Sequence, residues 1–534
     1  MTQNRSNNRL PTTGRSWLGT TIVALVASIS ILPLAAWIVV TVLDLVAQSG
    51  FAQVLPWDAA GWWLLAKTLL LAGAASVVSA LIGLAPAIAI ARGSKVFAGL
   101  VICLAAICVL TPSIVHSYAW SQCLRLLGIT PFPASAGDIF RCVWTQGCWL
   151  WGIFAVLVGL AARRLDPEIS AAAHLDGGRL RVLIGSLRGT MACVCGIILL
   201  LCAAEFAVFE QTGIRVIATE ARIAYDTGLR PGQASSPRIT QDGRAALAIA
   251  TVIPLAIALI LLLSMTLTAI GRGHWQLAES AAPKAAFAKH GIAAAAAMIV
   301  SVLVPLVALV ASLSSLELLY PTRMLAIFAP QLAGTLFIGF TVFIVAALLA
   351  AAGAIAHPRA VYAAAIASLT VFTLGGLVLA IAQLQVWINV PAISDSFPIV
   401  LFAHLARLAW IPLLAGRWLH TSGWQNLRDG AAVDGASTWQ TLVGVLLPIG
   451  WPILASAAAC TALLAMTEVP ANLILANQNP PMLTPMLMTW VHMLRYDDMI
   501  VGSLLLTFIA VVLGGSAAFA LWVGLTIRQS DKKA

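Results

Sequence analysis

Charged residues are scarce in this chain. They make up 9% of its 534 residues, whereas a soluble globular domain carries about 25%. Hydrophobic residues make up 61%, and a water-soluble fold could not hide that much apolar surface. The composition therefore excludes a soluble protein and predicts an integral membrane protein without a sizeable soluble domain.

The sequence also lacks the short motifs of nucleotide hydrolysis and of common catalytic sites. The phosphate loop G-x-x-x-x-G-K-[ST] does not occur, and neither do H-E-x-x-H or G-x-S-x-G. The nine Cys residues include no C-x-x-C pair, and most lie in apolar runs, where small core residues are expected. We predict no catalytic site, no cofactor and no metal site; any ATP hydrolysis would come from another chain.

Long apolar runs recur along the chain, each long enough to cross a hydrocarbon core of roughly 30 Å as a helix. Because backbone groups in lipid must be satisfied internally, the fold class expected is all-α. The first run is too long for a cleaved signal peptide and is expected to be retained. Twelve spans are predicted, at roughly 18–43, 62–91, 97–119, 142–162, 190–210, 245–270, 291–315, 331–356, 360–383, 397–417, 450–475 and 499–525.

The basic residues predict an orientation for these spans. The net charge of +10 is spread over many short loops, which argues against nucleic-acid binding and fits the excess of Lys and Arg in cytoplasmic loops. Nineteen of the 30 Lys and Arg residues fall on the side that holds both termini. We predict a cell (inner, cytoplasmic) membrane protein with both termini in the cytoplasm. The cytoplasmic regions would be the N-terminal tail 1–17, the loops near 92–96, 163–189, 357–359 and 417–449, the linker 271–290 and the tail 526–534.

The two halves of the chain, 18–270 and 291–525, resemble each other. A run that starts at Thr68 and ends at Arg92 matches one from Thr335 to Arg359. The fifth spans match around Glu205 and Glu468. These matches, in the same order, predict a duplication with two six-helix repeats in the same orientation. Repeats of this kind place a transport pathway between the halves, on an axis along the membrane normal.

A polar stretch rich in small residues precedes the fifth span of each half. In the second half it runs over 429–448, and an Asp-Gly pair, Asp434-Gly435, follows the small residues. Gly435 allows a turn with positive φ, Ser437 is placed to cap a second short helix, and Pro448 near the start of a span loses no helical hydrogen bond. A helix–turn–helix outside the membrane is expected. The fainter copy in the first half spans 171–190.

The stretch at 429–448 resembles the EAA loop of ABC-transporter permeases, the membrane subunits of binding-protein-dependent importers. The family motif reads E-A-A, three residues, G, nine residues, then I-x-L-P, and the second half fits it without a gap. The first half departs from it, because Ala171 replaces the acid and Gly189-Thr190 replaces Leu-Pro. The residues that match or flank the motif are Asp429, Gly430, Ala431, Ala432, Asp434, Gly435, Ala436, Leu447 and Pro448, with Ala172, Ala173, Asp176 and Gly177 in the first half.

The resemblance covers nearly the whole chain and implies a function. Two halves in one polypeptide are similar to the fused permeases of ferric-iron importers, which implies a type I importer fold. The loops would couple to separate ABC ATPase subunits, expected as a dimer, and the opposite face would receive substrate from a periplasmic or extracellular solute-binding protein. The substrate implied is ferric iron, with thiamine, phosphonate and polyamine as alternatives. The rivals from other classes are a 6+6 secondary transporter and a structural or assembly membrane protein.

Charge is costly inside a membrane span, and three charged residues within the predicted spans are singled out. Glu205 and Glu468 occupy equivalent places in the fifth spans, and Arg407 lies in the tenth. They are candidates for the translocation pathway, and Arg407 is a candidate partner of Glu468. The alternative is that the two carboxylates fix helix packing.

The segment 478–498 carries four Met residues together with Trp490 and His492. A soft-metal site is one interpretation. The favoured one is the apolar face of an interfacial helix with a Trp anchor.

Overall fold

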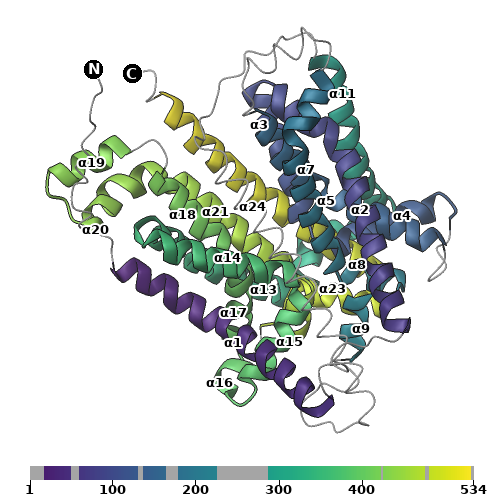
Figure 1. The fold of residues 1–534 in the computed structure, drawn as a ribbon. Coiled ribbons are helices and arrows are strands. Elements are labelled where there is room, and N and C mark those ends of the chain that lie inside the picture. Colours follow the sequence, from purple (N-terminus) through teal and green to yellow (C-terminus); the bar gives the residue numbers. More distant parts are fainter. Residues whose placement is uncertain are drawn as a thin grey trace.

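The chain is a multi-pass helical membrane protein. The computed structural model describes residues 17–49, 59–129, 136–163, 179–224, 287–421, 425–475 and 480–530, and all regular structure within these ranges is helical (Figure 1). Within these ranges, eight helices are long and apolar enough to cross a membrane, or as many as eleven if each of three bent pairs is one span. The span expected at 245–270 lies outside the described residues.

The helices of the first part of the chain are α1 (Trp17–Ser49), α2 (Ala59–Arg92), α3 (Lys95–Leu110), α4 (Ser113–Leu126), α5 (Ala136–Arg163), α7 (Arg179–Ala203), α8 (Ala207–Thr212) and α9 (Ile217–Ala224). Those of the second part up to its fourth span are α11 (Phe287–Met298), the π-helical turn η4 (Ile299–Leu303), α12 (Val304–Ala311), the 3-10 turn η5 (Leu316–Leu319), α13 (Pro321–Ile355), α14 (Pro358–Leu374), α15 (Gly376–Trp387), α16 (Pro391–Ser394), α17 (Phe397–Leu408) and α18 (Trp410–Thr421).

The remaining helices are α19 (Gln425–Val433), α20 (Thr438–Thr441), the π-helical turn η6 (Leu442–Leu446), α21 (Leu447–Thr467), α22 (Pro470–Leu475), α23 (Leu483–His492) and α24 (Tyr496–Ser530).

The segment predicted as a span at 97–119 is not one straight helix. The chain bends by 92° between α3 and α4. Thr111 is extended, with ψ of 133°, because the residue before a proline is pushed out of the helical region, and Pro112 follows. The span 360–383 is broken in the same way, by 108° between α14 and α15. There Gly375 has a φ of +88°, which ends a helix.

A weaker bend of 51° divides the span expected at 397–417 into α17 and α18. Pro412 lies in the first turn of α18. Its missing N–H and its ring prevent an unbroken helix through Leu408 and Ala409. The three bends together show why hydropathy located these segments but not their shape.

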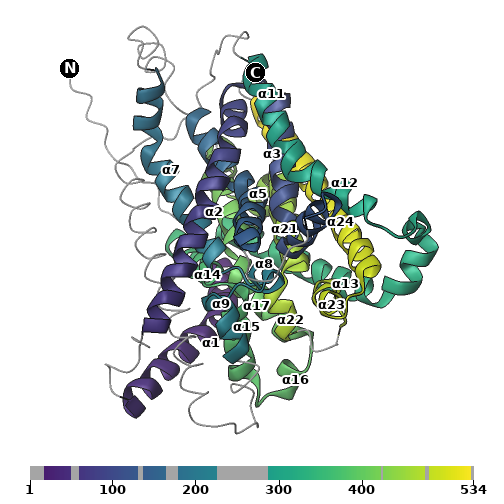
Figure 2. The same ribbon diagram turned by 90° about the vertical axis from the view of Figure 1, so that its right-hand side faces the viewer.

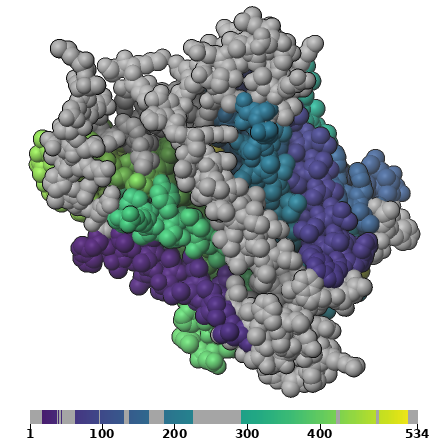
Figure 3. Space-filling model, viewed as in Figure 1, coloured from purple at the N-terminus to yellow at the C-terminus, as the bar shows by residue number. Residues whose placement is uncertain are grey.

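The first helix of each part packs on the other part. Helix α1 contacts α13, α14, α15 and α17, and Figure 3 shows it lying along the green helices of the second part. Conversely, α11 packs on α2 and α12 packs on α4. The turned view in Figure 2 shows α11 lying beside α3 of the first part. The Thr20 hydroxyl fixes α1 at one end, because it accepts a hydrogen bond from the His357 N–H at 3.0 Å. The exchange ties the two parts into one body.

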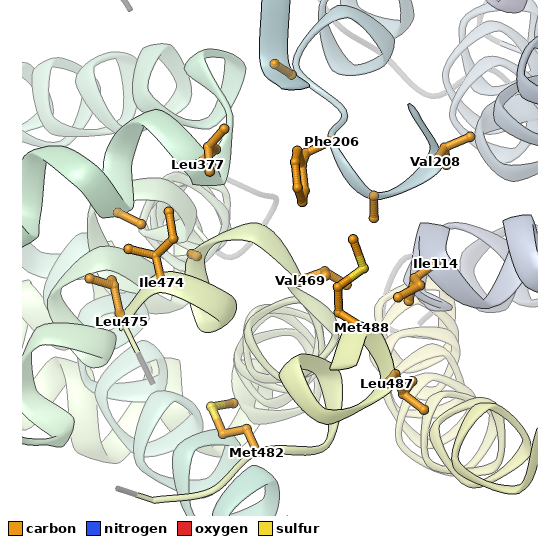
Figure 4. Close-up of a cluster of buried hydrophobic side chains, with 14 of the residues drawn as sticks. Ile114, Phe206, Val208, Leu377, Val469, Ile474, Leu475, Met482, Leu487 and Met488 are labelled. Atoms are coloured by element: carbon orange, nitrogen blue, oxygen red, sulfur yellow. The ribbon is translucent and has the colours of Figure 1, made fainter. Parts of the chain in front are cut away.

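Helices of the first part also contact helices of the second part, and two of these contacts join equivalent elements: α3 with α21, and α14 with α7. Helix α3 also contacts α24. The largest apolar core draws buried side chains from both parts, among them Phe206 and Phe209 from the first and Leu379 and Ile399 from the second. This largest core therefore lies between the two parts (Figure 4).

Small residues let the long helices approach closely, as is common where lipid provides no hydrophobic driving force between helices. A Cβ on Gly416 of α18 would collide with the Ala350 carbonyl oxygen of α13, and a Cβ on Gly353 of α13 would lie 2.9 Å from the Leu413 carbonyl oxygen. In contrast, a Cβ on Gly73 of α2 would meet nothing within 4 Å.

We predict that Gly416→Ala destabilises the protein by about 1–3 kcal/mol, because one added methyl group forces α13 and α18 apart. The measurement is the thermal unfolding midpoint in detergent. Gly73→Ala is the matched control and should leave the midpoint unchanged or slightly higher. Equal midpoints for the two variants would contradict the close contact.

Candidate functional site

Helices α19 and α20 form a short helix–turn–helix between the spans α18 and α21 (Figure 1). The turn is built on Gly435, whose φ is +77°. The Gly435 N–H donates to the Ala432 carbonyl oxygen at 3.2 Å, and the Ala436 N–H donates to the Ala431 carbonyl oxygen at 2.9 Å. These are the two bonds of a Schellman motif, which satisfies the last carbonyls of α19. The positive φ expected at Gly435 is confirmed.

Ser437 caps α20, as predicted. Its hydroxyl accepts a hydrogen bond from the Gln440 N–H at 3.3 Å, and the Gln440 side chain accepts one from the Ser437 N–H at 2.8 Å. This reciprocal capping box satisfies two N–H groups that the helix itself leaves unpaired. The direction of the chain after Gly435 is therefore fixed by local contacts.

Pro448 is in the first turn of α21, but the helix does not start there. The position of Pro448 near the start of a long helix is as expected, but helical structure is continuous from Thr438 to Thr467. The π-helical turn Leu442–Leu446 lies directly before the proline. A π turn already interrupts the regular i→i−4 ladder, so the ring is accommodated without ending the helix.

The surface of the helix–turn–helix is small, apolar and exposed. Val433, Trp439 and Leu427 expose 81%, 61% and 51% of their surface, and a Cβ on Gly430 or Gly435 would meet nothing within 4 Å. Asp429, Ala432 and Asp434 are also exposed and Ala431 and Ala436 are half-buried. Three large apolar side chains on one short exposed segment are typical of a protein-binding surface. The first copy of the loop, with Ala172, Ala173, Asp176 and Gly177, lies outside the described residues.

Glu205 and Glu468 mark a second site, deeper in the molecule. Both were predicted inside spans, and this is wrong: α7 ends at Ala203 and α21 at Thr467, so each carboxylate lies in the break that follows a long helix. After each break a short helix begins, α8 at Ala207 and α22 at Pro470. Glu205 and Glu468 are 263 positions apart, and so are the first residues of α8 and α22.

Glu205 is buried and held by neutral donors. Its Oε1 accepts hydrogen bonds from the Ser113 hydroxyl at 2.8 Å and from the Ala207 N–H at 2.9 Å. Ser113 is the first residue of α4, so the break between α3 and α4 meets the break between α7 and α8. The carboxylate thereby links the two breaks of the first part.

Glu468 is held by a charge. It forms an ion pair with Arg407, and the two side chains are 15% and 13% exposed. The pairing predicted for Arg407 and Glu468 is confirmed. The guanidinium carbon also lies 5.1 Å from the centre of the Phe372 ring, in a cation–π arrangement. Gly376, the first residue of α15, lies against the pair, and a Cβ there would collide with Glu468 Oε1.

A buried amide closes the break after α21. The Asn472 side chain donates to the Ala465 and Glu468 carbonyl oxygens at 3.1 and 2.6 Å. Its Oδ1 lies 2.9 Å from His404 Nε2. These contacts satisfy carbonyls that the helix end would leave unpaired in an apolar environment.

The breaks of the two parts meet at one place. Gly375 lies in the break between α14 and α15, and Ala204 is the residue before Glu205. A Cβ on Gly375 would lie 3.0 Å from the Cβ of Ala204. Four residues at these breaks were not predicted from the sequence: Ser113, Gly375, Gly376 and Asn472. A signal for three of them was present, since Pro112-Ser113 and Gly375-Gly376 are helix-breaking pairs 263 positions apart inside long apolar runs.

In the segment with four Met residues, the Trp anchor expected at a membrane interface is wrong, because Trp490 is buried. Met482, Met488 and Trp490 are 3%, 2% and 4% exposed, and Trp490 packs edge-on against Phe328 with ring centres 5.2 Å apart. These three residues belong to the core, whereas Met493 and Leu494 near the end of the segment are 63% and 65% exposed. Among the residues that the structure describes, no group of three or more His, Cys, Asp or Glu side chains is placed to hold a metal ion.

Comparison of the chain with protein-family models, with curated proteins and with solved structures returned no match.

We predict that Glu468→Gln destabilises the protein by about 3–5 kcal/mol, because it leaves the Arg407 guanidinium buried without a countercharge. Glu205→Gln should cost no more than about 1.5 kcal/mol, since an amide oxygen can still accept from the Ser113 hydroxyl and the Ala207 N–H. Thermal unfolding of both variants in detergent compares the two carboxylates directly.

Arg407→Met is the control, because it removes the uncompensated charge. In the Glu468→Gln background it should restore part of the lost stability. Equal losses from Glu468→Gln and Glu205→Gln would show that the ion pair does not stabilise the break.

Proposed function

We propose that the chain is the membrane-spanning permease subunit of an ATP-driven ABC importer. The observation that carries the proposal is the exposed helix–turn–helix at 425–441, which joins two spans and follows the residue pattern of the EAA loop. In this proposal Val433 and Trp439 insert into a cleft of a separate ATPase subunit. ATP is bound and hydrolysed by that subunit, and the permease needs no cofactor of its own.

The order of helices in the two parts supports the proposed duplication. In each part a long helix (α2, α13) precedes a sharply bent pair (α3–α4, α14–α15), and the fourth element follows (α5, α17–α18). A long fifth helix then ends at a Glu and is followed by a short helix (α7–α8, α21–α22). We infer two same-orientation repeats of six spans each, with the span at 245–270 completing the first, and a pathway between them.

In the proposed cycle, closure of an ATPase dimer pulls on the cytoplasmic loops and rocks the two parts between inward and outward access. Both termini would be in the cytoplasm, and the opposite face would receive substrate from a solute-binding protein. Ferric iron is the proposed substrate, on family resemblance alone. Thiamine, phosphonate and polyamine are the alternatives that uptake measurements separate.

The test is transport by the full chain reconstituted with the ATPase that co-purifies from its native membrane. Uptake of the substrate should require ATP on the side of the membrane where the ATPase subunit binds. It should stop when ATP is replaced by a non-hydrolysable analogue. Uptake driven by an ion gradient, with no ATPase subunit present, would contradict the proposal and favour a secondary transporter.

We predict that Val433→Asp and Trp439→Asp each abolish binding of the ATPase subunit without lowering thermal stability, because both side chains are exposed. An interface residue at the centre of a contact contributes about 2 kcal/mol or more, a loss of thirtyfold or more in affinity. Co-purification with the ATPase subunit measures the effect.

Leu316→Asp is the matched control. Leu316 exposes 65% of its surface and lies in η5, just before the start of α13. The other end of α13 contacts the start of α1, so Leu316 and the start of α1 lie at opposite ends of α13. It should leave ATPase binding unchanged. Retained binding in the Val433 and Trp439 variants would show that the ATPase docks elsewhere.

The two loops should not contribute equally. We predict that Gly435→Arg and Asp429→Lys reduce ATPase binding more than Gly177→Arg and Ala171→Lys, because the second loop keeps the full spacing of the motif. Gly435→Arg also places a bulky side chain at a φ of +77°, where only glycine is free of strain. Equal losses from both loops in the same pull-down would contradict the inequality.

A further inference from the structure

Helix α14 has an exposed strip that begins with a positive charge and continues with apolar side chains. Arg359, Tyr362, Ala363 and Ile366 are all exposed, and their spacing places them on one face of the helix. Tyr362 and Ile366 expose 46% and 43% of their surface. Figure 3 shows part of α14 at the surface of the molecule, beside α1. We call these four residues the α14 strip.

A second arginine, Arg417 of α18, lies beside the α14 strip. Its guanidinium carbon is 5.9 Å from the centre of the Tyr362 ring, in a cation–π arrangement. Arg359 is on the same face of α14 as Tyr362 and precedes it by one turn, where side chains are neighbours. The tyrosine ring is thus next to guanidinium groups from two different helices.

The charge on the α14 strip is not balanced by acids on the helices that carry it. Neither α14 nor α18 contains an Asp or Glu residue. The acid nearest in sequence after α18, Asp429, lies 4.0 Å from the Arg428 guanidinium. The Arg359 side chain is exposed, and in the part of the chain that the structure describes it makes no hydrogen bond or ion pair. Arg359 therefore presents a full positive charge to whatever covers the strip.

The strip begins where two helices reach a membrane surface. Arg359 is the second residue of α14, and Arg417 lies one turn before the end of α18. The exposed helix–turn–helix follows α18, and Arg428 of α19 donates to the His420 carbonyl oxygen of α18 at 2.8 Å. Helices α19 and α20 are too short to cross a membrane. The end of α18 therefore marks the membrane surface.

Aromatic side chains mark the same level. Trp17 is the first residue of α1 and exposes 77% of its surface. One turn later, Thr20 accepts a hydrogen bond from the N–H of His357, the residue before α14 begins. Trp and Tyr are enriched at the level of the lipid headgroups, and long basic side chains at helix ends reach toward the same level. Trp17 and Tyr362 thus place the two arginines among the headgroups.

We propose that Arg359 and Arg417 bind the phosphate of an anionic phospholipid of the phosphatidylglycerol type. Tyr362 orients the Arg417 guanidinium, and an acyl chain lies along Ala363 and Ile366. Arginine suits phosphate because its planar fork donates two parallel hydrogen bonds. A zwitterionic lipid has the same phosphate, but it also brings a cation that two arginines repel. The proposal needs only that the chain spans a membrane, so it does not rest on the proposed function.

Lipid binding by the full chain tests the site. The chain is purified in a neutral detergent, and phosphatidylglycerol or phosphatidylcholine with the same acyl chains is titrated in and counted by native mass spectrometry. Phosphatidylglycerol should bind more tightly. Arg359→Gln and Arg417→Gln should each weaken its binding by about fivefold, the factor that corresponds to about 1 kcal/mol for each basic residue near an anionic lipid. The double variant should lose about 25-fold.

Arg125→Gln is the matched control. Arg125 lies near the end of α4, and its guanidinium carbon is 6.0 Å from the centre of the Tyr496 ring, so it makes the same kind of contact. Two acids, Asp497 and Asp498, directly follow that tyrosine. This variant should bind phosphatidylglycerol as wild type does. Equal affinity of wild type for the two lipids, unchanged binding in the Arg359→Gln Arg417→Gln double variant, or an equal loss from Arg125→Gln would overturn the proposal.

Two further arms separate a lipid from a free anion and guard against misfolding. Inorganic phosphate should not displace phosphatidylglycerol, compared with sodium chloride at the same ionic strength; displacement would show a site for small anions and overturn the lipid. Thermal unfolding shows whether each variant is folded. If Arg417→Gln gives no folded protein, Arg359→Gln decides alone, because its exposed side chain holds no other part of the described structure. Wild-type affinity of folded Arg359→Gln for phosphatidylglycerol would then overturn the proposal.

Discussion

The structure depends on one constraint: a polar group inside an apolar bundle must find its partner within the protein. Four helices break near the contact between the two parts, and each break frees backbone groups and admits polar side chains. The breaks persist because the partners are supplied locally. The Ser113 hydroxyl and the Ala207 N–H satisfy Glu205, Arg407 satisfies Glu468, and the Asn472 amide satisfies the carbonyls at the end of α21. Irregular backbone at the centre of the bundle is thus tolerated because it is buried in protein rather than exposed to lipid.

The same constraint is met differently in the two parts. In the first, a serine at the start of α4 reaches the carboxylate. In the second, the equivalent residue is Gly376, whose missing side chain leaves room for the Arg407–Glu468 pair. A hydrogen bond from a neutral donor is easily exchanged for another, whereas a mostly buried ion pair strongly penalises the loss of either partner. The second break is therefore held more firmly than the first, and the loop that matches the EAA motif better belongs to the same part.

Much of this could be predicted from the sequence, and the failures have physical causes. Hydropathy located the long helices because burial in lipid demands long apolar runs. The turn at Gly435 and the cap at Ser437 were predictable because both depend on contacts within a few residues. The sharp bends were not, since Thr111-Pro112 and Gly375 interrupt the backbone without interrupting the apolar pattern. The burial of Trp490 was missed because it depends on Phe328, which is far away in the sequence. The pairing of Arg407 with Glu468 was predictable only as the simplest way to place two opposite charges in one bundle.

We propose that this chain works as a permease that two ATPase subunits drive through its loops. Native mass spectrometry of the complex purified from its own membrane measures this most directly, because it gives the composition and the stoichiometry together. The account predicts one copy of this chain with two copies of a subunit that carries a phosphate-binding loop. A chain that is found without such a subunit, under conditions in which it transports its substrate, would contradict the account.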